Sequence, residues 1–147
     1  TGSVTIDMSA SGTQTSFSWA IVELSGMDTT GTNGSGAIVQ SATANGDSQT
    51  GLTPTLSAFG SANNASFACF AGSANNAITE EGGWTELSDL GNDDGGVDIY
   101  RMQSQFLASN DTTPNATWTS MDAAAVAVEI KAEAVATSDS FYRRKVQ

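Results

Sequence analysis

The side chains best able to do chemistry in this chain are carboxylates, since it contains 16 acidic residues and no histidine. Glu80 and Glu81 lie near Glu86 and Asp89, and glycoside hydrolysis requires two carboxylates at a set separation. A serine, threonine or cysteine nucleophile needs an activating base, and none is apparent. Sequence spacing does not fix the separation of two carboxylates, so we expect no catalytic residues and no enzyme.

A second acidic group has the composition of a metal site. Asn92, Asp93, Asp94 and Asp98 carry the oxygen ligands that Ca²⁺ prefers. The group lacks the spacing of an EF-hand loop, and the glycines around it already account for a tight turn. We therefore expect no metal and no cofactor, with Ca²⁺ at these four residues as the alternative.

Two further groups are candidates for contact with a ligand or a partner. Trp84 follows two glycines, so it is the tryptophan we expect to be exposed and able to stack on a sugar ring; more often such residues fill a core. Three of the five basic residues, Arg143, Arg144 and Lys145, lie together near the end. They are suited to an acidic partner, such as a neighbouring copy, and the alternative is a solvated end.

Composition limits the binding partners of the protein and the compartments in which it can be expected. The net charge of −11 repels nucleic acid and anionic membranes, and no stretch reaches the roughly 18 apolar residues of a membrane span. Cys69 is the only cysteine; it lies in an apolar run, where we expect a buried, inert thiol. Such low cysteine content suits a bacterial or phage product better than an animal secreted module. We expect a virion or an extracellular surface, with no nucleic acid partner and no membrane insertion.

The alternation of apolar and polar residues, with glycine- and asparagine-rich turns, predicts short strands. Turns are expected at residues 45–47 and 91–96, and Pro54 suggests an edge strand. The last strand is expected to point Val126, Val128 and Ile130 inward; a helix over residues 123–136 is the alternative. The expected strands are residues 4–8, 17–24, 37–42, 52–56, 64–72, 84–87, 97–107, 116–119 and 123–131. About eight to ten strands indicate an all-β antiparallel β-sandwich, jelly-roll or Ig-like.

A repeated sequence pattern, called the echo below, suggests that the chain is modular. Residues 21–24 match residues 127–130 at an offset of 106 residues, which indicates a module period of that size. On this interpretation residues 1–29 are a hairpin closing a preceding module, residues 30–133 are a β-sandwich module, and residues 134–147 are a polar, then basic, tail. The alternative is a single sandwich in which two hairpins occupy similar positions. The chain has no initiating Met or signal peptide, which is typical of a fragment, a processed product or an excised domain.

Three stretches resemble tandem β-sandwich modules of bacteriophage virion proteins and bacterial surface proteins. They are WAIVELSGMDTT at residues 19–30, GWTEL at residues 83–87 with the later DIYR at residues 98–101, and ATWT with AVAVEI at residues 116–119 and 125–130. Together with their connections they cover about half of the chain. The resemblance implies a non-enzymatic virion or appendage module that works beside other subunits.

Three functions from different classes follow from these observations. The leading hypothesis is a structural module of a phage particle, such as a capsid decoration, head fibre or tail appendage, acting through subunit packing as a homo-oligomer. The second is a carbohydrate-binding or adhesive module of a bacterial surface protein that contacts a host surface glycan. The third, a glycan-cleaving enzyme, has the least support because no base accompanies a nucleophile.

Overall fold

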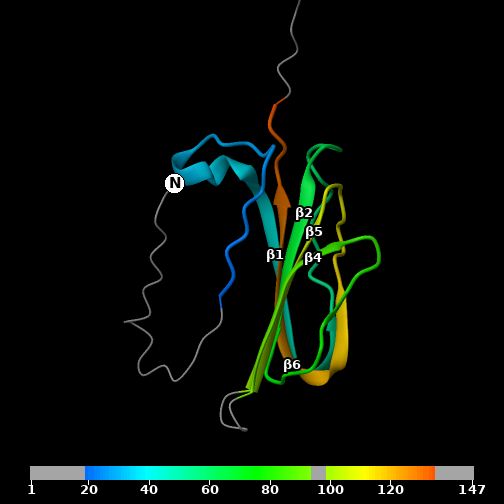
Figure 1. Ribbon diagram of the computed structural model, residues 1–147. Coiled ribbons are helices and arrows are strands. Elements are labelled where there is room, and N and C mark those ends of the chain that lie inside the picture. The colour runs from blue at the N-terminus through cyan, green and yellow to red at the C-terminus, as the bar shows by residue number, and fades with distance from the viewer. Residues whose placement is uncertain (1–18, 94–98, 135–147) are drawn as a thin grey trace, which may run out of the picture.

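An antiparallel β-sheet dominates the structure, and the all-β prediction is confirmed (Figure 1). The computed structural model describes residues 19–93 and 99–134. The only helical element in those ranges is the 3₁₀ segment η2 (Thr32–Ala37). The strands are β1 (Ile38–Leu52), β2 (Ala65–Gly72), β3 (Thr79–Glu80), β4 (Thr85–Asp93), β5 (Ile99–Leu107) and β6 (Ala116–Ile130).

The strand order is β1-β6-β2-β5-β4, with β3 also paired to β6. All of these pairs are antiparallel. β6 is the organising strand because it pairs with β1, β2 and β3, which join it from three separate parts of the sequence. β6 lies between β1 and β2, so both of its edges are paired.

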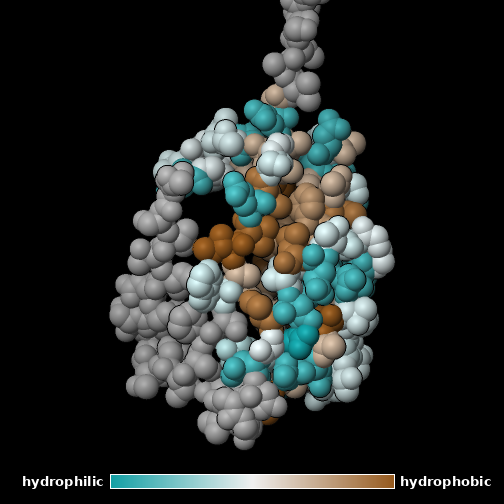
Figure 2. Space-filling model, viewed as in Figure 1, coloured by the Kyte–Doolittle hydropathy of each residue, from teal (hydrophilic) through white to brown (hydrophobic). Residues whose placement is uncertain are grey.

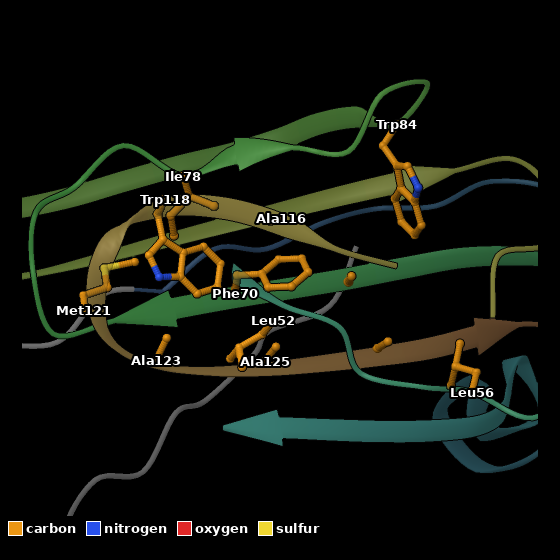
Figure 3. Close-up of a cluster of buried hydrophobic side chains, with 12 residues drawn as sticks. Leu52, Leu56, Phe70, Ile78, Trp84, Ala116, Trp118, Met121, Ala123 and Ala125 are labelled. Carbon is orange, nitrogen blue, oxygen red and sulfur yellow. The ribbon is translucent and has the colours of Figure 1, made fainter. Parts of the chain in front are cut away.

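β6 bends sharply near Met121, so its two halves lie on opposite sides of the core (Figure 3). β1 follows the bend through register shifts between Gly46, Gln49 and Gly51. Two hydrogen bonds hold the corner: Ser48 N–H donates to Asp122 Oδ1 at 2.8 Å, and Trp118 Nε1 donates to the Gln49 carbonyl at 2.8 Å. The two strands expected at residues 116–119 and 123–131 are therefore a single bent strand.

The core lies inside this bend. Phe70 of β2 and Trp118 of β6 meet with ring centroids 6.1 Å apart at 56°, and small alanines of β6 make room for both rings (Figure 3). The other side chains buried in this cluster are Leu52, Leu56, Ala68, Ile78, Trp84, Ala116, Met121, Ala123, Ala125 and Ala127.

The sidedness predicted for the end of β6 is wrong. Ala123, Ala125, Ala127 and Glu129 point toward the core, whereas Val126 and Val128 are only half-buried and lie on the other side. Ile130, the third residue of the predicted set, is buried. The physical reason is the size of Phe70 and Trp118, which leave space for alanine but not for valine across the bend. The helix alternative for this stretch is also wrong, because residues up to Ile130 form ladder pairs with β1 and β2.

Other local expectations divide into confirmed and corrected ones. Strands near residues 64–72, 84–87 and 97–107 are confirmed as β2, β4 and β5. The turn expected at residues 45–47 lies within β1, and the edge strand expected around Pro54 is a loop with Pro54 buried. Residues 19–24 are extended without ladder pairing. The strand expected at residues 4–8 lies outside the described residues.

The close approach of β1 and β6 at this corner can be tested by a substitution at Gly51. A Cβ there would lie 2.8 Å from the Ala116 carbonyl oxygen, a backbone atom of the neighbouring strand that moves only with the sheet. We expect Gly51→Ala to lower the free energy of unfolding by about 1–3 kcal/mol, as overpacking does, measured by urea denaturation. Gly82→Ala is the control, since nothing lies within 4 Å of its added Cβ. Equal stability of the two variants would contradict the close approach.

Candidate functional site

The side of the sheet turned away from the core is uncharged across five strands. Directly opposed residues of an antiparallel ladder share a side, so the pairing registers identify which side chains point outward. We call this surface the outer face. Its side chains are Ser41, Thr43 and Asn45 of β1, Ala124, Val126 and Val128 of β6, Phe67, Cys69 and Ala71 of β2, Met102, Ser104 and Phe106 of β5, and Thr85, Ser88 and Leu90 of β4. None of them is charged.

The charges of the same strands lie on the other side or at the bend. Glu86, Asp89, Arg101 and Glu129 are paired with residues of the core-facing side, and Asp122 lies at the corner. Figure 2 shows apolar surface gathered over the middle of the molecule, with hydrophilic surface around it. A contiguous apolar surface of this kind is typical of an interaction site.

An extended segment, residues 19–24, lies along one part of the outer face; we call it the arm. Val22 and Leu24 of the arm line a groove of about 260 Å³ together with Ile38, Phe67, Val126, Val128 and Ile130. In Figure 1 the arm runs on one side of the sheet, and the loops and first half of β6 lie on the other. The molecule therefore has the order arm, sheet, core and returning half of β6.

The arm is anchored just after its end. Asp28 N–H donates to the Lys131 carbonyl and Glu133 N–H donates to the Gly26 carbonyl, both at 2.9 Å. Met27 bridges Ala132 between them. The Asp28 carboxylate is buried and pairs with the Lys131 ammonium at 2.5 Å. This ion pair, with hydrogen bonds from Thr30, holds the pKa of Asp28 well below its usual range. The root of the arm is thus fixed to the residues that follow β6.

Cys69 lies on the outer face rather than in the core. It is half-buried, opposite Ser104 on one neighbouring strand and Val126 on the other. Burial raises the pKa of its thiol, which lowers its reactivity at neutral pH. The prediction of a fully buried thiol is therefore wrong.

Three of the four acidic residues considered as a hydrolytic pair lie near one another. Burial raises the pKa of Glu86, and the charges of Asp89 and Glu80 raise it further. Asp89 is held by Arg101 in a two-point ion pair, and Glu80 and Glu86 are exposed. The structure also brings Glu81 near Asp111, a residue that sequence reasoning missed because it lies on a distant loop. Burial raises the pKa of Glu81, and the nearby charge of Asp111 raises it further.

Both carboxylates of this pair already accept hydrogen bonds from other parts of the fold. Glu81 Oε2 accepts the Asn115 N–H at 2.9 Å, and Asp111 Oδ2 accepts Trp84 Nε1 at 3.2 Å. Asp111 Oδ1 accepts the Thr113 N–H at 2.8 Å, an Asx turn whose short Asp-Thr-Thr pattern was the available signal. The arrangement closes loops against β3 and β5, which is a structural task.

Trp84 is buried, with 8% of its surface exposed, so the prediction that it is the exposed tryptophan is wrong. Its ring packs in the core cluster and its N–H is bound to Asp111. Stacking on a sugar requires an open ring face, and burial removes the basis for that expectation. Among the described residues the exposed tryptophan is Trp19 of the arm.

The other predicted site residues lie mainly outside the described residues. Asn92 and Asp93 are at the end of β4, while Asp94 and Asp98 are not described, so the Ca²⁺ expectation is not tested there. Arg143, Arg144 and Lys145 are likewise outside. Within residues 19–93 and 99–134, no group of three or more histidine, cysteine, aspartate or glutamate residues is placed to hold a metal ion. No helix in those ranges is long and apolar enough to cross a membrane.

Comparison with protein-family models, curated proteins and solved structures finds no match for the chain.

The carboxylate pair predicts a pH-dependent effect at Glu81. Because its folded pKa is raised, its protonated form stabilises the fold below about pH 4.5, and this contribution is lost as the pH rises through the folded value. We expect Glu81→Gln to increase the free energy of unfolding at pH 7, by less than about 1 kcal/mol at this half-exposed position. The gain should vanish near pH 4. Urea denaturation at several pH values measures it.

The matched control is Glu80→Gln, which removes the same charge from the exposed neighbour. A gain for Glu81→Gln that is equal at pH 4 and pH 7 would contradict the coupling between Glu81 and Asp111.

Proposed function

We propose that the chain is a non-enzymatic structural module of a bacteriophage virion, such as a capsid decoration, head fibre or tail appendage, that acts by packing against other subunits. The observation that carries the proposal is the outer face, a wide uncharged surface on a chain of net charge −11. Solvated surfaces of acidic proteins carry their charge, so a face kept free of it is suited to contact with another subunit.

The proposal includes the finer architecture. The bend of β6 sets its first half and β3 across the core from the main sheet, as in two packed layers. This arrangement supports a β-sandwich module, jelly-roll or Ig-like, and the resemblance of the GWTEL and AVAVEI stretches to virion modules supports the same class. The echo at 106 residues supports a modular array, although the described part of residues 1–29 is bonded to the end of β6 in this unit.

A carbohydrate-binding or adhesive role is the second candidate, and one observation favours it. Trp19 is 53% exposed beside an apolar groove, and exposed aromatic rings stack on sugars. However, sugar sites also require polar groups that bind hydroxyls, and the groove is lined by aliphatic side chains and Phe67. The same features suit a protein surface better.

The test of a virion role is the composition of the particle. We expect the chain to be present in many copies in density-purified particles from lysates of the organism that encodes it, detected by mass spectrometry and immunogold labelling. Its absence from particles would contradict the virion assignment.

A glycan array with the purified chain is the companion measurement. We expect no saturable signal. Saturable binding to a defined glycan, lost on Trp19→Ala, would instead support the adhesive role.

A further inference from the structure

The arm is held on the outer face by two side chains. Val22 and Leu24 are half-buried and line the groove, whereas Trp19, Ile21 and Glu23, on the alternate positions, are exposed. The arm makes no hydrogen bond to any other described residue. It therefore contacts the sheet only through aliphatic side chains, and only on one of its two sides.

The space around the arm is loosely packed. Beneath the arm lies the groove of about 260 Å³, and beside it lies a second groove of about 520 Å³, which Val22 and Leu24 also line together with residues of η2. A closely packed element leaves few voids larger than a water molecule. Ordering a backbone segment costs conformational entropy at every residue, and two half-buried side chains offset only part of that cost. The position of the arm on the sheet is therefore only marginally favoured.

The residues just after the arm are firmly held. Asp28 is buried and paired with Lys131, and the Gly26 carbonyl accepts the Glu133 N–H at 2.9 Å. Gly26 has a φ of 73°, in the left-handed region, and nothing lies within 4 Å of the position that an added Cβ would take. Hinges are a few residues, often small ones, that absorb a change in the backbone angles. A pivot at Ser25 and Gly26 moves the arm and leaves its root in place.

We propose that the arm is a hinged cover of the outer face. In the closed form it lies over Phe67, Val126 and Val128; in the open form it has turned about Gly26, and these side chains meet solvent. Opening is local, because the sheet, the core and the root of the arm keep their contacts. The inference adds to subunit packing a step that uncovers the contact surface. It concerns the isolated chain and does not depend on the virion assignment.

Thiol labelling of the full chain measures this opening. The native thiol is removed as Cys69→Ser, and Val128→Cys places a reporter in the groove, with Val126→Cys as a second reporter. The control is Ala124→Cys, an exposed position on the same side of β6 that does not line the groove. We expect a maleimide to label Val128→Cys about 10-fold or more slower than Ala124→Cys. Low urea concentrations should hardly change this rate, because local opening exposes little surface.

Two substitutions on opposite sides of the arm show what holds it closed. Leu24→Asp places a charge in the apolar groove, so we expect labelling of Val128→Cys to accelerate to within about 3-fold of the Ala124→Cys rate. Ile21→Asp, at a position that is 65% exposed, is the matched control and should leave the labelling slow. Thermal unfolding should be the same for both variants, because neither position contributes to the core.

Three results would overturn the inference. Equal labelling of Val128→Cys and Ala124→Cys in the Cys69→Ser chain would show that the arm does not close over the sheet. Labelling of Val128→Cys that follows the urea dependence of global unfolding would show that the arm does not open by itself. An unchanged rate in Leu24→Asp would show that this side chain does not hold the arm. All three are independent of the particle measurement, so failure of the hinged cover and failure of the virion assignment remain distinguishable.

Discussion

The buried carboxylate of Glu129 is the interaction on which the arrangement of the sheet depends. It is fully buried and accepts three hydrogen bonds, from Gly60 N–H at 3.0 Å, Asn64 Nδ2 at 2.5 Å and Gln40 Nε2 at 2.7 Å. Burial by itself would raise the pKa of Glu129, but these donors lower it overall. A buried charge is tolerated only when its oxygens are satisfied. Its three donors lie on the core side, so this side of β6 faces inward.

That constraint fixes everything that alternates with Glu129. With Glu129 inward, the alanines of β6 face Phe70 and Trp118, and Val126 and Val128 must face outward. The same pairing places Phe67 and Cys69 outward on β2 and Phe106 on β5. Gln40 and Asn64 also tie β1 and the loop before β2 to the strand end, since Gln40 Oε1 accepts Ser57 N–H and Asn64 Oδ1 accepts Ala132 N–H. The side of the sheet on which these uncharged residues lie is thus tied to one satisfied carboxylate.

The sequence alone predicted several of the strands, but not their sidedness or their partners. Alternation and turn residues located β2, β4 and β5, because these depend on local pattern. In β6 both sides are apolar, so alternation carries little information, and a glutamate among valines ordinarily indicates the solvent side. Its three donors lie 65 to 89 residues away in sequence. The Glu81–Asp111 pair was missed for the same reason, since contacts between distant loops produce no periodic pattern in the sequence. Trp84 was misplaced because the glycines before it suggested an exposed turn, whereas its ring enters the core.

The surface on which the arm lies can be understood from where the acidic groups of the fold are engaged. Three acidic groups with a shifted pKa are engaged inside the fold: Asp28 by Lys131, Glu129 by three donors, and Glu81 beside Asp111. The outer face itself carries no charged side chain on its strands. The arm is anchored at Asp28 and lies on that face through side chains alone, which leaves it free to adapt to whatever packs over it.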